Sequence, residues 1–220
     1  MRTCRRQLLD EFLNEVKPHL VGVVLDIGGK KSDKRGLFRP PLNQVDSWLY
    51  LNIDSTTSPN IVASADQIPL PDECIDTFVL CEVLEHLAEP EKCLSEASRI
   101  LKPGGEGIIT IPFLYPIHAD PWDFQRWTDV RIKRELTRVG LELVELRIMG
   151  GMFAVLIDIL HIQLNELPKY AKLRRRAGIL VLKIAKYVFR SMVSNPNPRI
   201  TTGYGLIARK PKMQCNLIKQ

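Results

Sequence analysis

Short apolar runs alternate along this sequence with segments of helical periodicity, and this alternation constrains the fold more than any other feature. The first run stops at Gly28 and Gly29, and the second stops at Asp54. Runs of this length are typical of strands buried in a parallel sheet. The predicted strands cover residues 21–27, 48–53, 61–63, 75–80, 107–111, 141–148 and 204–208.

Helices are predicted between several of these strands. An N-terminal helix ends at Pro18, a second begins at Pro90, and a third follows the capping residue Thr128. Residues 102–105 (Lys-Pro-Gly-Gly) combine the residue types that end a helix and form a turn. Residues 30–47 carry Gly and Pro with little periodicity, so they are predicted to be mostly loop.

The alternation of strands and helices predicts a mostly parallel sheet that is covered on both faces. Residues 152–195 interrupt the final strand pair and contain two helical patterns. We therefore predict one α/β domain over residues 1–220. Its fold is Rossmann-like and doubly wound, with seven mostly parallel strands, helices on both faces and a helical, basic insertion or lid at 152–195.

Ligands bind such sheets beyond the carboxyl ends of the strands. Gly28 and Gly29 follow the first strand and allow a ligand to approach the backbone closely. An acid at the end of the second strand, Asp54, can accept both hydroxyls of a ribose. The topology adds further candidates at the other strand ends: Asp26, Asp66, Cys81 and Glu82.

Three adjoining motifs are more specific than the glycine loop. Residues 65–76 read ADQIPLPDECID, residues 77–87 read TFVLCEVLEHL, and residues 99–105 read RILKPGG. Together with the acid-glycine loop and Asp54, they resemble the class I S-adenosylmethionine-dependent methyltransferases. The resemblance is to the small-molecule branch that includes ubiquinone/menaquinone-biosynthesis-type enzymes, and it spans residues 21–112.

The resemblance implies S-adenosylmethionine as cofactor and a role for each matching position. Asp26, Gly28 and Gly29 would line the methionine moiety, Asp54 would hold the ribose, and the backbone at Cys81 would face the methionine amine, with Glu82 beside it. Asp66 would accept from the adenine amino group, with Gln67 next to it. The sequence departs from the family at residues 30–32, where Lys-Lys-Ser replaces a third glycine.

The segment that leaves the fifth strand, residues 111–128, is dense in aromatic, His, Asp and Arg residues. In the proposed family the acceptor meets the cofactor here, so His118 and Asp120 are candidate catalytic bases. Tyr115, Asp123 and Arg126 are candidate substrate-binding residues. The alternative is a loop packed by its own aromatics, with Arg126 paired to an acid. The loop loosely resembles one in methyltransferases associated with surface-polysaccharide synthesis.

Charge is distributed unevenly along the chain. The last acidic residue is Glu166, and residues 167–220 carry a net charge of +13, whereas the rest carries −7. A basic helix with apolar residues can lie on an anionic membrane surface. It can equally pack on the domain, cover the acceptor as a lid, or form a dimer surface. The oligomeric state is left open.

The cysteines predict neither a disulfide framework nor a metal site. The five residues are odd in number and form no Cys-x-x-Cys pair. Residues 1–17 lack an apolar signal core. A cytoplasmic protein, with peripheral contact at the membrane surface as one hypothesis, is therefore expected.

The predicted function is methyl transfer to oxygen or nitrogen of a small-molecule, glycan or lipid-linked acceptor. A nicotinamide-dependent oxidoreductase is disfavoured because both Tyr-x-x-x-Lys and G-x-G-x-x-G are absent. A nucleic-acid methyltransferase using the basic C-terminal region is disfavoured because no Asn/Asp-Pro-Pro-Tyr/Phe motif follows the fourth strand. A non-catalytic methyltransferase-like protein remains an alternative, supported by the lysines at 30–31.

Overall fold

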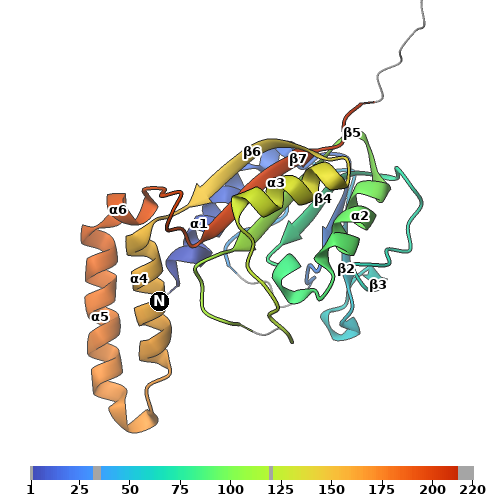
Figure 1. Cartoon of the computed structure of the whole chain (residues 1–220). Helices are drawn as coiled ribbons and strands as arrows, with labels where there is room; N and C mark the ends of the chain where they lie inside the picture. Colours follow the sequence, from blue (N-terminus) through green and yellow to red (C-terminus); the bar gives the residue numbers. More distant parts are fainter. Residues whose placement is uncertain (1, 32–35, 119–120, 213–220) are drawn as a thin grey trace, which may run out of the picture.

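The computed structural model describes residues 2–31, 36–118 and 121–212 and has a seven-stranded sheet at its centre (Figure 1). The strand order is β3-β2-β1-β4-β5-β7-β6. Neighbouring strands from β3 to β5 pair in parallel, whereas β7 is antiparallel to both β5 and β6. The strands are β1 (Val23–Ile27), β2 (Ser47–Asn52), β3 (Ile61–Val62), β4 (Ile75–Cys81), β5 (Leu101–Pro112), β6 (Glu142–Met149) and β7 (Gly203–Arg209).

Helices cover both faces of the sheet, which confirms the predicted doubly wound arrangement. On one face, α1 (Cys4–Glu15) packs with Phe12 and Leu13 in a buried cluster with strand residues such as Val24 and Val79. On the other face, α2 (Pro90–Ile100) and α3 (Asp129–Arg138) share a cluster with Leu25 and Leu80. Adjacent strand residues thus enter opposite cores, as the alternation of side chains along a strand requires.

The starts of α2 and α3 agree with the sequence prediction, whereas the cap of α1 was not predicted. The Thr3 hydroxyl accepts from the Arg6 amide at 3.1 Å and caps α1. Thr128 caps α3 in the same way, and Pro90 occupies the first turn of α2. Three short 3-10 turns lie between α1 and β1 (η1, Lys17–His19), between β2 and β3 (η2, Ser55–Thr57) and between β4 and α2 (η3, Leu84–His86).

Residues 102–105 differ from the prediction. The second helix ends at Ile100, as expected, but the Lys-Pro-Gly-Gly segment belongs to β5 and forms no separate turn. Gly104 has a φ of +84°, and its amide donates to the Lys210 carbonyl at 2.7 Å. The positive φ and a register shift opposite Ile75 allow the chain to stay extended through this segment.

The insertion before the last strand is helical, as predicted. It consists of α4 (Met152–Asn165), η4 (Lys169–Ala171), α5 (Lys172–Val188) and α6 (Arg190–Ser194). Helices α4 and α5 lie side by side as a hairpin that extends away from the sheet beside α1 (Figure 1). No helix in the described residues is both long enough and apolar enough to span a bilayer.

The hairpin is attached to the domain through Asp158, which is buried. Its carboxylate accepts from the backbone amides of Cys4 and Arg5, the latter at 2.8 Å. These are among the first amides of α1, which have no partner inside that helix. A side chain of α4 thereby supplies the hydrogen-bond acceptor for the first amides of α1.

Candidate functional site

A pocket lies at the carboxyl ends of β1 and β4, between the sheet and α1. Five of the eight residues predicted to bind the cofactor line it: Asp26, Gly28, Gly29, Cys81 and Glu82. The remaining lining comes from α1, from the loop after β1, and from residues of β2 and β4: Arg6, Asp10, Leu13, Lys30, Phe38, Pro40, Tyr50 and Val79. The strand ends that the sequence singled out therefore form one site.

The glycine loop has little room for larger side chains. Gly28 has a φ of +78°, and a Cβ atom there would lie 2.6 Å from Val83 Cγ2. A Cβ on Gly29 would lie 2.3 to 2.6 Å from the carboxyl atoms of Asp26. A larger residue at either position would therefore displace Val83 or Asp26, and glycine leaves the backbone accessible at the pocket.

Asn52, which the sequence reasoning missed, holds this loop in place. Its side-chain amide donates to the carbonyl oxygens of Gly28 at 3.0 Å and Gly29 at 3.1 Å. The Gly28 amide in turn donates to the Leu51 carbonyl at 2.8 Å. A buried polar residue at the end of the otherwise apolar β2 was the available signal.

Asp54, Asp66 and Gln67 lie outside the lining of this pocket. The Asp54 carboxylate accepts from the amide of Thr56 at 2.9 Å and from its hydroxyl at 2.6 Å, and it caps η2. Asp66 lines a separate hollow with Lys92 and other residues of α2. Their roles in ribose and adenine binding remain predictions.

Glu82 lies at the end of β4 with a φ of +55° and forms an ion pair with Arg5 of α1. The Arg5 side chain is 3% exposed and the Glu82 side chain 13%. Burial alone would raise the pKa of Glu82, but the Arg5 guanidinium outweighs this effect and the pKa lies below its ordinary value. Glu82 is therefore a carboxylate at the pocket, and Arg5 is a second residue that the sequence reasoning missed.

Cys81 does not have the properties of a nucleophile. Burial raises the pKa of its thiol to about 12, with a further contribution from the nearby Glu82 charge. A thiol with such a pKa is almost entirely protonated near neutral pH. Cys81 thus contributes its backbone and its shape to the pocket, in agreement with the sequence-based expectation.

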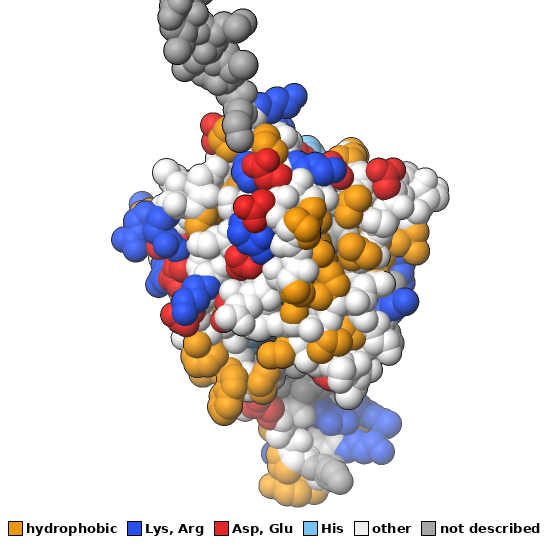
Figure 2. Space-filling model, turned by 90° about the vertical axis from the view of Figure 1, so that its right-hand side faces the viewer, with side chains coloured by type: hydrophobic (Ala, Val, Ile, Leu, Met, Phe, Trp, Pro, Cys, Tyr) orange, Lys and Arg blue, Asp and Glu red, His pale blue; other side chains and the backbone are white. Residues whose placement is uncertain are grey.

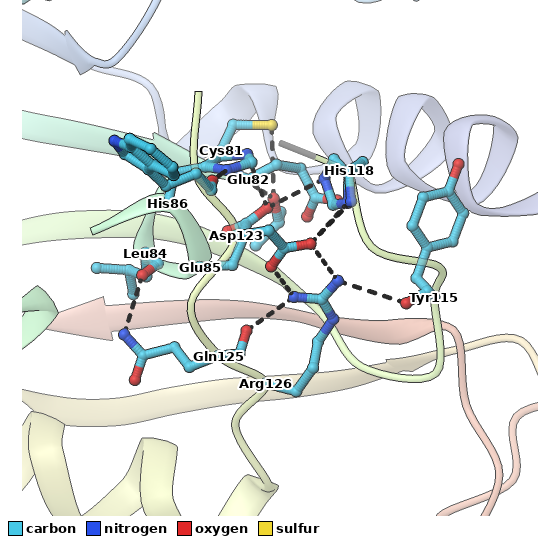
Figure 3. Close-up of polar contacts among 12 residues, drawn as sticks. Cys81, Glu82, Leu84, Glu85, His86, Tyr115, His118, Asp123, Gln125 and Arg126 are labelled. Atoms are coloured by element: carbon cyan, nitrogen blue, oxygen red, sulfur yellow. Dashed lines mark hydrogen bonds and ion pairs between the residues drawn. The ribbon is translucent and has the colours of Figure 1, made fainter. Parts of the chain in front are cut away.

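The loop after β5 brings four of the five predicted acceptor-side residues together, as Figure 3 shows. Arg126 Nη2 donates to Asp123 Oδ2 at 2.7 Å, and the His118 amide donates to the same oxygen at 2.9 Å. The Tyr115 ring meets the His118 ring edge-on at 5.4 Å. Asp120 lies outside the described residues.

These contacts set the ionisation of the loop. Hydrogen bonds from Arg126 lower the pKa of Asp123 to about 2. The Glu85 carboxylate raises the pKa of His118, although burial acts in the opposite direction. Arg126 and Asp123 pair with each other, as the alternative interpretation of the loop expected. Contact of either residue with an acceptor remains a prediction.

Glu85 and His86, on the short turn η3, also face this loop. The Glu85 side chain is fully buried, and the Glu85 carbonyl accepts from the Phe124 amide at 2.8 Å. His86 Nδ1 lies 2.6 Å from the Trp122 carbonyl oxygen. The sequence pattern marked this turn as part of a motif but gave Glu85 no role.

Comparison with known proteins identifies similar sequences for part of the chain. Residues 45–109 match the family described as "Methyltransferase domain". The ubiquinone/menaquinone biosynthesis C-methyltransferase UbiE of Rickettsia bellii is 28% identical over 123 residues, which cover 45% of this chain and 47% of that enzyme. The matched stretches span less than half the length of the first curated relatives.

Solved structures are similar over nearly the whole chain. The crystal structure of the cyclase SpnF has a TM-score of 0.61 at 17% identity, covering 92% of this chain and 82% of that one. An S-adenosylmethionine-dependent methyltransferase from Archaeoglobus fulgidus has a TM-score of 0.57 at 18% identity, covering 93% and 94%. These similarities establish the fold, and a shared fold alone does not determine the reaction.

Proposed function

Because this chain carries a class I S-adenosylmethionine-dependent methyltransferase domain, we propose that it transfers the methyl group of this cofactor to oxygen or nitrogen of a small-molecule, glycan or lipid-linked acceptor. The observation that carries the proposal is the pocket that Asp26, Gly28, Gly29, Cys81 and Glu82 form next to the polar loop after β5. The family match covers the second and fourth strands and the motifs between them.

The pocket fits the cofactor on two grounds. Gly28 and Gly29 line the pocket, where a Cβ atom would collide with Val83 or with the Asp26 carboxyl group, so the backbone itself is presented to a ligand. Asp26 and Glu82 supply carboxyl groups to the same lining, which complements a positively charged sulfonium and an amino group. When bound, S-adenosylmethionine supplies an activated methyl group.

The chain's own contribution would be mainly to align the reactants. Holding an acceptor atom in line with the methyl group can lower a barrier by about 7–11 kcal/mol in favourable cases. The loop at residues 113–127 stands at the end of β5, next to the end of β4 that carries Glu82, and would form the acceptor wall. His118 would act on the acceptor there, with Asp123 3.5 Å from its Nδ1 and Arg126 holding Asp123 in place.

An amphiphilic or lipid-linked acceptor is favoured by the surface of the hairpin. Its helices expose large apolar side chains, among them Leu173, Val181 and Tyr187, next to the basic residues at 174–176. Peripheral contact with an anionic membrane would bring such an acceptor to the domain. This contact and the resulting location at a membrane surface belong to the proposal.

The test is transfer of a labelled methyl group from S-adenosylmethionine to fractions of a cell extract. Label is expected in a lipid, glycan or small-molecule fraction. Gly29→Val, whose side chain would displace the Asp26 carboxyl group at the pocket, should abolish both cofactor binding and labelling. His118→Ala should keep cofactor affinity within about twofold, because His118 does not line the pocket, and should reduce labelling.

The other outcomes identify the alternatives. Label in RNA or DNA would favour the nucleic-acid methyltransferase. Cofactor binding without labelling in any fraction would favour the non-catalytic relative. A folded protein with no affinity for S-adenosylmethionine would contradict the proposal altogether.

A further inference from the structure

Glu85 is a buried carboxylate that no described residue satisfies with a hydrogen bond. Its side chain has 0% exposure, and neither Oε1 nor Oε2 has a hydrogen-bond partner within the described part of the chain. Burying a carboxylate without such partners is costly, so native structures rarely keep one unless a cation compensates it. The position of Glu85 therefore calls for a positive charge close to the carboxylate.

Two imidazoles point their Nε2 atoms at this carboxylate. His86 Nε2 lies 3.6 Å from Glu85 Oε1, and His118 Nε2 lies 3.7 Å from the same oxygen. One ligand atom from each of the three residues can be chosen so that all lie within 4.8 Å of one another. The centroids of the two rings lie 5.1 Å apart, and the rings meet edge-on.

The Nδ1 atom of each ring already has a hydrogen-bond partner. His86 Nδ1 lies 2.6 Å from the Trp122 carbonyl oxygen, and His118 Nδ1 lies 3.2 Å from the Pro116 carbonyl oxygen. A carbonyl oxygen only accepts, so each Nδ1 carries a proton, and Nε2 is the nitrogen of each ring that can bind a metal ion. Two Nε2 atoms and a carboxylate oxygen thus converge on one point. The Arg126 guanidinium interacts electrostatically with Glu85 but forms no hydrogen bond to it, so this point can accommodate a further cation.

We propose that Glu85, His86 and His118 bind a divalent transition-metal ion such as Zn²⁺. Tetrahedral coordination at about 2.1 Å places ligand atoms about 3.4 Å apart, so the observed spacing requires only a small inward movement. Metal-bound histidines usually donate their other ring N–H to a carbonyl or carboxylate. Both imidazoles meet this condition, and Asp123 Oδ2 lies 3.5 Å from His118 Nδ1 as a second such partner.

Three protein ligands leave a coordination position open. The His118 side chain is 31% exposed, whereas those of His86 and Glu85 are 13% and 0% exposed, so the site is most accessible beside His118, on the loop after β5. A metal ion there would polarise an acceptor hydroxyl and lower its pKa. This catalytic role rests on the proposed function, whereas metal binding itself does not. The sequence-based expectation of no metal considered only cysteine spacing.

The test measures metal binding by the chelator-treated, untagged full chain. Zn²⁺ is titrated against a chromophoric chelator, and Co²⁺ is added separately to record its visible absorption. One equivalent is expected to bind per chain. Glu85→Gln and His118→Asn should each weaken binding at least about tenfold. The matched control His19→Asn, which lies beside Glu106 at the opposite end of β5, should leave metal binding unchanged.

A second variant and a cofactor titration serve as controls for the metal-binding measurement. If Glu85→Gln fails to fold, His118→Asn decides, because His118 lies on a partly exposed loop. Titration of S-adenosylmethionine into the metal-free protein separates this proposal from the proposed function, and that binding should persist. Metal affinity of the wild type no higher than that of the Glu85→Gln, His118→Asn double variant would overturn the proposal and leave protons on the imidazoles as the compensating charge.

Discussion

Arg5 is the buried cation that compensates Glu82 at the pocket. Its guanidinium reaches Glu82 from α1 and also contacts Met149 Sδ at 3.0 Å. Removing one member of a buried ion pair leaves the other charged and desolvated, which is more costly than removing both. The stability of the domain and the charge of the pocket are therefore linked through this one side chain.

Arg5→Met is expected to lower the free energy of unfolding by about 3–5 kcal/mol, because it leaves the Glu82 carboxylate buried without its ion-pair partner. Urea denaturation measures the change. The double variant Arg5→Met, Glu82→Gln should recover part of the loss. A loss below about 1 kcal/mol, the value of an exposed pair, would contradict the buried ion pair.

Asp54→Ala is expected to weaken binding of S-adenosylmethionine at least tenfold, measured by calorimetry. Hydrogen bonds from two ribose hydroxyls to a carboxylate are worth about 1.5–3 kcal/mol each. Thr56→Ala is the matched control, because it removes the hydroxyl that Asp54 accepts from but keeps the carboxylate. Equal affinities of all three folded proteins would remove the ribose role from Asp54.

Asp76 ties together the beginnings of three strands. Its carboxylate accepts from the Val23 amide at 2.9 Å and from Lys102 Nζ at 2.8 and 2.9 Å. Burial raises the pKa of Asp76, but these donors outweigh it and the pKa lies below its ordinary value. The stabilisation is therefore present above the pKa of the unfolded chain and is lost as pH falls through the lower folded value.

Asp76→Asn should accordingly destabilise the protein near neutral pH and much less in acid. The comparison is the difference in unfolding free energy between the two proteins from pH 7 down to the acid limit of folding. The difference should begin to shrink below about pH 4, near the pKa of an unperturbed aspartate. A difference that stays constant across this range would show that the charge of Asp76 does not stabilise the fold.

Asp158 connects the hairpin to α1, as Asp76 connects the strands to one another. Asp158→Ala removes the acceptor for two amides of α1, and loss of such a cap costs about 0.5–2 kcal/mol. Hydrogen exchange should become faster in α4 and α5, with β1 and β4 unaffected. Asp158→Asn keeps one acceptor oxygen and should show a smaller effect. Uniform acceleration throughout the sheet would instead indicate global destabilisation.

At the scale of helices and strands, the sequence predicts those features that depend on residues close together in the chain. Apart from the early start of β5, the apolar runs and the cap Thr128 correspond to elements of the structure within a few residues. Arg5 and Asn52 were missed because their partners lie 77 and 24 residues away, and no periodicity encodes such pairings. Glu85 was missed because the sequence places it within a family motif, and only the fold shows that His118 lies beside its carboxylate.

Across the whole molecule, charged residues are arranged differently on the sheet domain and on the hairpin. On the face in Figure 2, which lies away from the hairpin, acidic and basic side chains are interspersed. The hairpin instead combines exposed apolar residues with Arg174, Arg175 and Arg176. Each basic residue near an anionic surface contributes about 1 kcal/mol of attraction, which salt screens.

Binding to vesicles tests the membrane contact. Co-sedimentation with phosphatidylserine-containing vesicles should fall as salt is raised and should fall when the arginines at 174–176 become Gln. The control changes Lys92, Lys133 and Arg134 to Gln, which removes the same charge from α2 and α3. Equal loss in both variants would indicate net charge alone, and no binding at low salt would reject the contact.

The position of β7 also has a consequence for synthesis of the protein. β7 is inserted between β5 and β6 and is the only strand that β6 pairs with among the described residues. On a translating ribosome, β1, β2 and β4 can assemble while β5 and β6 still present open edges. These edges close only after residue 209 has emerged, so a chaperone that shields them would act within that interval.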